Sequence, residues 1–288
     1  MEQSILTCYL CNNSDFKTRK GTVRDNSSLK ILECTSCGLV ALSSIQHIEA
    51  GHYEDSGMHG KTLPSIESWL RETELDDQRR FEMLKTALVN RKVLDFGCGA
   101  AGFLRKAQSI AEEVAGIELE HRVREYWGDK LALHANLDDA GGGYDIISAF
   151  HVVEHLPDPR AMLTDLATRL KETGRLIIEV PSSEDVLLTL YDNDAFQRFT
   201  YWSQHLFLFN PETLRQIAEQ AGLRIVSIRQ YQRYPLSNHL HWLSCGKPGG
   251  HQSWSFLDTP GLSEAYAASL AAVGKCDTLI AYMERDPD

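Results

Sequence analysis

A glycine-rich turn between a buried strand and a helix constrains the fold of this 288-residue chain more than any other feature. The stretch RKVLDFGCGAAGFLRKA has apolar residues at Val93 and Leu94. Gly97, Gly99 and Gly102 then form a G-x-G-x-x-G pattern ahead of helical residues. Glycine lets the backbone approach a ligand closely and leaves the start of the helix open toward it. The pattern therefore predicts a nucleotide-type cofactor at the carboxyl end of a parallel strand.

The residues around this turn alternate between strand and helix patterns. Five apolar segments between residues 91 and 181 are expected to be strands: RKVLDF, EVAGIE, LALHAN, YDIISAF and RLIIEV. PETLRQIAEQAG then has the pattern of a helix, and LRIVSIRQYQ and NHLHWLSC are expected to form a terminal antiparallel pair. The alternation predicts an α/β fold with a doubly wound, mostly parallel, Rossmann-like sheet and helices on both faces.

Two cofactor classes, NAD and S-adenosylmethionine, fit the glycine turn. Glu118 follows the second strand, where a carboxylate is well placed to bind a ribose diol. Asp95 stands two residues before Gly97. The pyrophosphate of a dinucleotide disfavours an acidic residue at that position, whereas a sulfonium cofactor with a cationic amino-acid head tolerates one. The sequence therefore favours S-adenosylmethionine.

Four of the seven cysteines form two C-x2-C pairs near the start of the chain, Cys8/Cys11 and Cys34/Cys37. Zinc takes four thiolates in a tetrahedron, and a short segment can fold around such a site. We expect a structural zinc site with no open position for catalysis. A redox dithiol is the alternative, but this segment lacks the strand–helix context of a thioredoxin-like motif.

Composition limits the classes of binding partner and the cellular compartment that we expect. The net charge is −11, and no run of Lys or Arg is present, so nucleic acid is an unlikely partner. No window of 18 uncharged apolar residues occurs, so no membrane span is expected. The first residues, MEQSILTCYLCNNSD, lack the basic and apolar regions of a secretory signal. We expect a cytoplasmic protein that acts on a small molecule.

Four motifs carry a resemblance to a known family: VLDFGCGAAG, GIELE, YDIISAFHVVEHLPDP and GRLIIEVPSS. They resemble the first motif, the acidic ribose-binding motif, and the fourth and fifth strands of class I S-adenosylmethionine-dependent methyltransferases. The resemblance covers about residues 91–245. The cysteine pairs and the later segment WSQHLFLF are similar to zinc-containing sugar C-methyltransferases and to methyltransferases from surface-polysaccharide gene clusters. Those enzymes act on nucleotide-linked sugars or glycans.

The resemblance implies nine cofactor-binding residues, each in a motif of the nucleotide half of the fold. Asp95, Gly97 and Gly99 are expected at the methionine end, Gly102 at the helix start, Glu118 at the ribose, Asn136 and Leu137 beside the adenine, and Phe150 and His151 at the cofactor edge.

The resemblance also implies that two histidines act in catalysis. His155 matches the histidine of an E-H pair after the fourth strand, and His205 matches the base of a Y-x-E-H segment. Here Gln204 stands in place of the glutamate, and Trp202 occupies the tyrosine position, with Tyr201 one place away. A carboxylate raises the basicity of an imidazole and an amide does not, so O- and C-methylation both stay open. We predict that His205 is the proton acceptor, with His155, Tyr201 and Gln204 in the same site.

The expected organisation has four parts. A zinc-binding segment covers 1–45, a helical connector 46–90, the methyltransferase domain 91–245 with a substrate lid near 183–210, and a helical tail 246–288. The tail is expected to pack on the sheet, with a homo-oligomer contact or a lid as alternatives. The competing functions are an NAD-dependent oxidoreductase and a non-catalytic cofactor-binding scaffold with a zinc ribbon.

Overall fold

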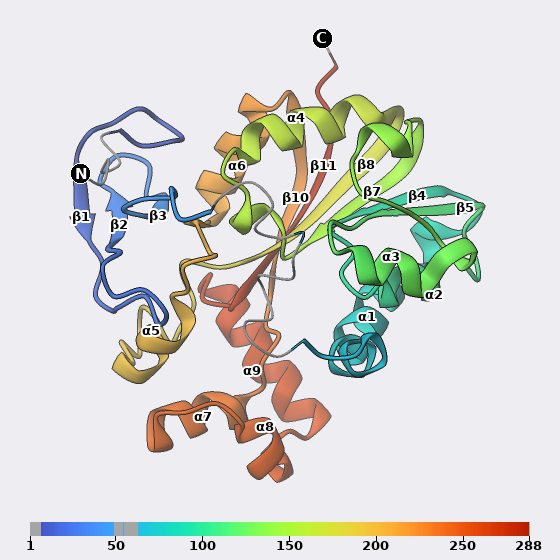
Figure 1. The fold of residues 1–288 in the computed structure, drawn as a ribbon. Helices are drawn as coiled ribbons and strands as arrows, with labels where there is room; N and C mark the ends of the chain where they lie inside the picture. Colours follow the sequence, from blue (N-terminus) through green and yellow to red (C-terminus); the bar gives the residue numbers. More distant parts are fainter. Residues whose placement is uncertain (1–6, 49–53, 55–62, 288) are drawn as a thin grey trace.

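The computed structural model describes residues 7–48, 54 and 63–287, and a twisted sheet forms their centre (Figure 1). Across the sheet, the seven strands of this described part are β10 (Leu223–Tyr231), β11 (Thr278–Arg285), β8 (Leu170–Pro181), β7 (Tyr144–Phe150), β4 (Lys92–Phe96), β5 (Glu113–Ile117) and β6 (Ala132–His134). The strands from β8 to β6 are parallel, whereas β11 is antiparallel to both β8 and β10. The expected mostly parallel α/β sheet is confirmed.

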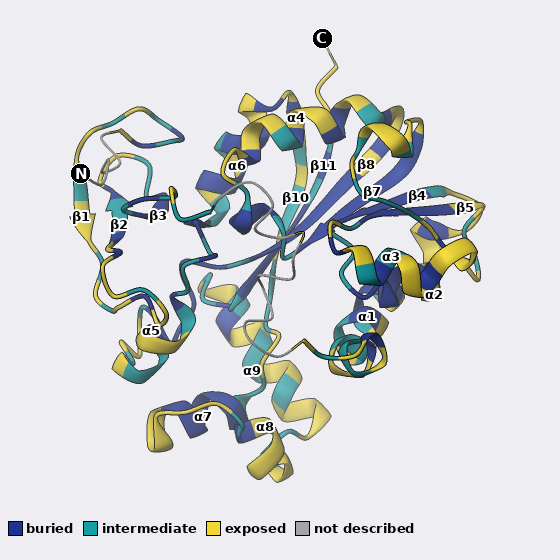
Figure 2. Ribbon diagram, viewed as in Figure 1, coloured by how far each residue is buried: buried dark blue, intermediate teal, exposed yellow. Residues whose placement is uncertain are grey.

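Alternation along the strands places side chains on the two faces of this sheet. Leu94 and Ile147 pack in one buried cluster with α4 and α6, whereas Val93 and Ile146 pack in a second cluster with α1, α2 and α3. Strand β7 is buried along its whole length, and β4 is buried after its first residue (Figure 2). This double burial explains why their sequences are nearly continuous apolar runs.

Helices cover both faces (Figure 1). On one face lie α1 (Ile66–Leu88), α2 (Gly102–Ala107) and α3 (His121–Trp127), and on the other α4 (Pro159–Arg169) and α6 (Pro211–Gln220). The described residues also form α5 (Asp194–Thr200), α7 (Leu236–Cys245), α8 (Gly250–Ser253) and α9 (Pro260–Ala272). Side-chain caps begin several of them: Ser65 caps α1, Asp158 caps α4 ahead of a proline, and Asn210 caps α6. The expected connector helix is the single helix α1. The histidines expected in the preceding loop, His52 and His59, lie outside the described residues.

The N-terminal residues form a small antiparallel sheet in the order β1 (Phe16–Thr18), β2 (Ile31–Cys34), β3 (Val40–Leu42) and β9 (Phe207–Leu208). We call residues 7–48 the cysteine module. Its edge strand β3 pairs with β9, which belongs to the segment expected to be a lid. The module therefore joins the rest of the chain through backbone hydrogen bonds.

The structure corrects two predictions at the C-terminal end. The segment expected as a strand, NHLHWLSC, belongs to helix α7, which begins after Pro235. The tail expected to be helical contains α8 and α9 but ends in the strand β11, which inserts between β10 and β8. The true antiparallel partner of β10 is therefore β11, in a register that joins Leu223 to Arg285. Among the described helices, none has the length and apolar character needed to cross a membrane.

Candidate active site

A cavity of about 550 Å³ opens at the carboxyl ends of the parallel strands. All nine residues expected at the cofactor line it: Asp95, Gly97, Gly99, Gly102, Glu118, Asn136, Leu137, Phe150 and His151. His155 also lines the cavity, together with Val152 and Met162. The fold thus brings residues from four strand ends to one crevice, as doubly wound sheets do.

The glycine turn forms the floor of this cavity. Gly97 has a φ of +69°, and a Cβ placed on it would lie 2.5 Å from Cγ2 of Val152. Gly99 donates its backbone N–H to Oε2 of Glu118 at 2.8 Å. A larger residue at Gly97 would therefore be both strained and obstructed, so the turn depends on the absence of side chains.

Two carboxyl groups face this floor in buried surroundings. Ser148 donates its hydroxyl to Oδ1 of Asp95 at 2.7 Å, and the backbone N–H of Glu120 donates to Oε1 of Glu118 at 2.8 Å. Burial raises the pKa of Asp95 to about 7 and that of Glu118 to about 7. Desolvation disfavours the charged form of both, and a cationic ligand beside them would favour it again.

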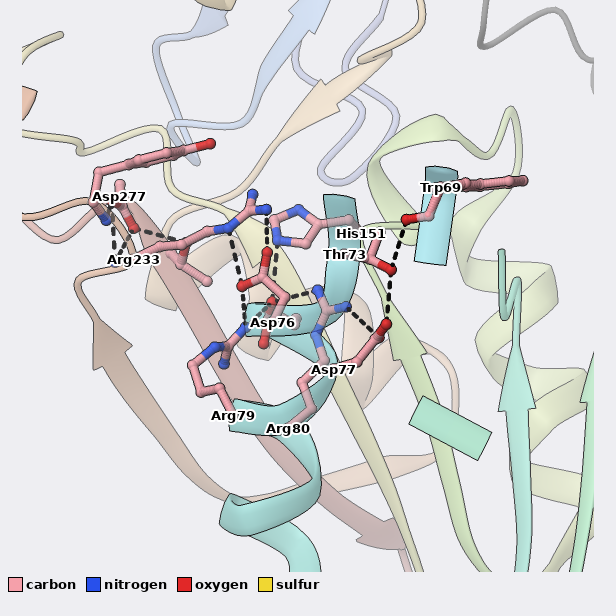
Figure 3. A network of polar contacts seen from close by, with 12 residues as sticks. Trp69, Thr73, Asp76, Asp77, Arg79, Arg80, His151, Arg233 and Asp277 are labelled. Atoms are coloured by element: carbon pink, nitrogen blue, oxygen red, sulfur yellow. Dashed lines mark hydrogen bonds and ion pairs between the residues drawn. The ribbon is translucent and has the colours of Figure 1, made fainter. Parts of the chain in front are cut away.

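A buried ionic network that the sequence analysis missed borders the cavity (Figure 3). Glu179 on β8 is fully buried, and Arg79 and Arg80 of α1 each donate to its Oε1 at 2.8 Å. Nε2 of His151 lies 3.1 Å from the same oxygen. The guanidinium group of Arg80 also stacks 4.6 Å from the ring of Phe150 and lines the cavity. One available signal was the acidic residue inside the apolar strand RLIIEV, since such a residue is buried only with partners.

The network fixes the charge state of its members. Burial alone would raise the pKa of Glu179, but His151 and the two arginines hold it well below its ordinary range. Burial alone would lower the pKa of His151, but Glu154 and Glu179 raise it. His151 also has a φ of +55°, in the left-handed region that non-glycine residues rarely adopt. A strained residue held by two carboxylates is typical of a functional site.

A cluster of two histidines and a glutamate lies at one end of the cavity. His155, in the short 3-10 helix Val153–His155, has its ring 4.9 Å from the ring of His205. Glu154 is fully buried, and its Oε1 receives a hydrogen bond from Nδ1 of His151 at 3.2 Å. The ring of Trp202 lies 5.5 Å from that of His205. His155 thus borders the cavity and His205 lies behind it.

Burial also determines the protonation of this cluster. It lowers the pKa of His205 to about 3 and also lowers the pKa of His155, so both rings are neutral at pH 7. Nε2 of His155 and Oε1 of Glu154 are 4.0 Å apart. This is wider than the about 3.4 Å expected between two ligands of one zinc ion. The ligand atoms of Glu154, His155 and His205 nevertheless all lie within 4.8 Å of one another.

The two remaining predicted catalytic residues lie further from the cavity. Gln204 is buried, and its backbone forms a hydrogen bond with the ring of His155. Tyr201 is also buried, with its ring against Gly21 of the cysteine module. Neither side chain lines the cavity. Their positions indicate support of the histidine pair rather than contact with a cofactor.

The four cysteines of the two C-x2-C pairs meet in one cluster, as expected. Their sulfur atoms all lie within 4.8 Å of one another, with Cys8 3.6 Å from Cys37 and Cys11 3.5 Å from Cys34. Sulfur ligands of one tetrahedral zinc ion are about 3.8 Å apart. Burial alone would raise the pKa of Cys34, but backbone N–H groups of Cys37 and Ser36 lower it to about 6, whereas burial raises the pKa of Cys8 and that of Cys37. The geometry and chemistry of the cluster therefore fit a zinc ion.

Comparisons with known proteins agree with this geometry. A family model described as a methyltransferase domain matches residues 67–228, more than half of the chain. A ubiquinone biosynthesis O-methyltransferase of Coxiella burnetii (strain Dugway 5J108-111) is 25% identical over 166 residues, which are 52% of this chain and 71% of that protein. A protein of the same name from Methylococcus capsulatus is 21% identical over 217 residues, 69% of this chain and 91% of its own. A SAM-dependent methyltransferase from Archaeoglobus fulgidus has a similar fold, with a TM-score of 0.50 at 19% identity over 74% of this chain and 94% of its own.

Proposed function

The chain belongs to the methyltransferase domain family as an S-adenosylmethionine-dependent methyltransferase, and we propose that it methylates a hydroxyl group of a small, sugar-containing acceptor. The observation that carries the proposal is the contact between His155, which lines the cavity, and His205 behind it. A neutral imidazole beside the space for the cofactor supports the assignment of a proton acceptor there. An NAD-dependent oxidoreductase or a non-catalytic scaffold is not favoured.

The cavity residues fit S-adenosylmethionine, which supplies an electrophilic methyl group when bound. The glycine turn offers a floor without side chains, and Glu118 offers a carboxylate for the ribose hydroxyls. Asp95 and Arg80 both line the cavity. The ammonium group of a methionine head would favour the charged form of Asp95, and the guanidinium group of Arg80 suits its carboxylate. Asn136 and Leu137 border the space for the adenine.

In the proposed reaction the histidine pair takes up the proton that the acceptor hydroxyl loses. Attack by a neutral hydroxyl produces a protonated ether, which is a far stronger acid than an imidazolium ion. An imidazole of low pKa therefore suffices as the proton acceptor. Glu154 stabilises the imidazolium ion that forms, because its carboxylate is buried beside both rings. The cavity walls align the hydroxyl and exclude water.

The weak basicity of His205 favours O-methylation over C-methylation. C-methylation requires prior removal of a proton from carbon, for which an imidazole of pKa about 3 is a poor base. The replacement of the expected glutamate by Gln204 acts in the same direction, since it removes a carboxylate from the segment Tyr201 to Leu206, the histidine loop. Relatives named O-methyltransferases agree with this assignment.

The surface next to His205 supports a sugar-containing acceptor. The guanidinium group of Arg24 stacks 4.6 Å from the ring of Trp202 and 5.5 Å from that of Phe199, and Phe199 is 42% exposed. Aromatic rings stack on sugar rings, and arginine binds phosphate groups through its planar donors. A nucleotide-linked sugar or a phosphorylated glycan fits this combination.

A second candidate is an acceptor like that of the relatives named for ubiquinone biosynthesis. It rests on sequence similarity to those proteins. The family match begins at residue 67, so the cysteine module that borders the histidine loop lies outside it. We therefore place the sugar-containing acceptor first.

We also propose that the four cysteines bind one structural zinc ion. The sulfur distances support this, as does the small size of the sheet that surrounds them. Metal analysis of the purified protein should give about one zinc ion per chain, and the variant Cys11→Ser should lower that ratio. A well-folded protein without metal would contradict the proposal.

Two measurements test the transfer reaction. Calorimetric titration with S-adenosylhomocysteine should show binding, and a parallel titration with NAD should show none. Transfer of a labelled methyl group should then be followed with a panel of nucleotide sugars and, as the rival class, phenolic hydroxyl compounds. His205→Ala should abolish the transfer to the accepted compound, and full turnover with an unchanged pH dependence would remove His205 from the mechanism. Labelling of the phenolic compounds alone would replace the sugar assignment.

A further inference from the structure

The segment from Tyr201 to Leu206, here called the histidine loop, carries His205 between two parts of the molecule. On its inner side, the backbone N–H of Leu206 donates to the carbonyl oxygen of Glu154 at 2.8 Å. This bond connects the loop to the 3-10 helix that contains His155. The inner side therefore sets the distance between the two histidines.

On its outer side, the histidine loop is held by the cysteine module. Asp25 accepts two hydrogen bonds from Ser203, one from the backbone N–H at 2.9 Å and one from the hydroxyl at 2.7 Å. The backbone N–H of Arg24 donates to the carbonyl of Tyr201 at 2.9 Å, and that of Leu42 donates to the carbonyl of Leu206 at 3.1 Å. The loop is thus anchored near its start, middle and end.

Two side chains of the module also touch the loop. Nε2 of His47 lies 2.6 Å from the carbonyl oxygen of Ser203, and the guanidinium group of Arg24 covers the ring of Trp202. Trp202 in turn contacts the rings of both His155 and His205. Contacts therefore run without a break from the module to the histidine pair.

The anchoring residues depend on the cysteine cluster for their own positions. Arg24 and Asp25 lie in the segment between the two C-x2-C pairs, and Leu42 and His47 follow the second pair. Cys34 ends β2, which pairs with β3, and β3 pairs with β9 directly after the histidine loop. A change in the cluster is therefore transmitted to the loop through two adjacent strands.

We propose that Asp25 is a positioning residue for methyl transfer, through which the cysteine module holds His205 against His155, the histidine that lines the cavity. The proposal rests on the function assigned above to His205. It gives the module a role in the reaction, although its cysteines do not contact the cofactor cavity. Asp25 itself lies outside the cavity lining and touches the loop rather than the reacting groups.

The first test measures the loop without any acceptor. Hydrogen–deuterium exchange of a peptide that covers residues 201–206 should become faster in Asp25→Ala and less so in Asp25→Asn, because asparagine keeps one acceptor oxygen for Ser203. Asp15→Ala is the matched control, since Asp15 lies in the same module and contributes its backbone carbonyl to hydrogen bonds with Asn13 and Thr35. Unchanged exchange in both Asp25 variants would overturn the proposal.

The second test separates positioning from general damage. In Asp25→Ala the dissociation constant of S-adenosylhomocysteine should stay within about twofold, while kcat for labelled methyl transfer to the compound found in the panel falls by about 10- to 100-fold. Equal losses in binding and in kcat would overturn the positioning role. Faster exchange of the loop with full kcat would also overturn the positioning role of Asp25, whereas His205→Ala tests the assignment of His205 separately. If Asp25→Ala does not fold, Asp25→Asn gives the same comparison.

Discussion

Glu179 and Glu284 allow a direct measurement of what burial does to an ion pair in this protein. Each glutamate lies on a strand of the central sheet, Glu179 on β8 and Glu284 on β11, and each forms ion pairs with two arginines. Glu179 is fully buried and binds Arg79 and Arg80, whereas the side chain of Glu284 is 23% exposed and binds Arg175 and Arg224. Removal of one partner from a buried pair leaves an uncompensated charge and costs about 3–5 kcal/mol, whereas a surface pair contributes about 0–1 kcal/mol.

We therefore expect Glu179→Gln to lower the free energy of unfolding by about 3–5 kcal/mol, and Glu284→Gln by at most about 1 kcal/mol. For a chain of this size the first change lowers Tm by about 6–20 °C. Differential scanning calorimetry and urea unfolding at pH 7 measure both.

The same pair gives a pH dependence. The pKa of Glu179 is depressed in the native state, so its contribution to the free energy of unfolding is complete above the ordinary glutamate pKa and is lost as the pH falls through the native value. The difference between wild type and Glu179→Gln should accordingly shrink below about pH 4.3. Equal losses in the two variants would refute the argument from burial.

Three further predictions concern pH and the glycine turn. Burial lowers the pKa of His205 to about 3, so its ring stays neutral and kcat should show no acidic limb between pH 5 and 8; a limb near pH 6.5 would contradict this environment. Burial raises the pKa of Asp185 to about 8, so the native state holds a proton that the unfolded state lacks between about pH 4 and 8. Stability should therefore fall as the pH rises across this interval, and Asp185→Asn should reduce the difference between the urea midpoints at pH 5 and 8, while Asp95 and Glu118, whose pKa values are also raised, keep the remainder. Gly97→Ala should weaken S-adenosylhomocysteine binding at least about tenfold, since its Cβ meets Val152, whereas Gly141→Ala, with the same φ of +69° and open space around it, should leave the calorimetric affinity unchanged.

The sequence was most informative where local chemistry and local structure coincide. The turn from Gly97 to Gly102 needs residues without side chains, and the four cysteines need a fixed spacing, so both appear as short motifs. The sequence was least informative where long-range packing decides the structure. Residues 236–245 mix apolar and polar side chains, and residues 278–285 contain a short apolar run. Periodicity cannot distinguish a buried strand from a buried helix segment at that length.

The buried network around Glu179 shows the same limit at the site. Arg79 and Arg80 lie on a helix whose pattern is ordinary, and their partner is about a hundred positions later in the chain. Spacing along the sequence carries no sign of that pairing. The anchoring of Ser203 by Asp25 is similarly distant, so the link between the cysteine module and the histidine loop emerged only from the fold.

The place of β11 has a consequence for how the chain is made. During synthesis β8 and β10 leave the ribosome well before β11, yet in the finished sheet β11 lies between them and is antiparallel to both. Until residues 278–285 emerge, β8 and β10 each have one edge with unpaired backbone N–H and C=O groups. Such an edge can pair with a strand of another nascent chain. The growing polypeptide must therefore keep the edges of β8 and β10 apart until β11 has emerged.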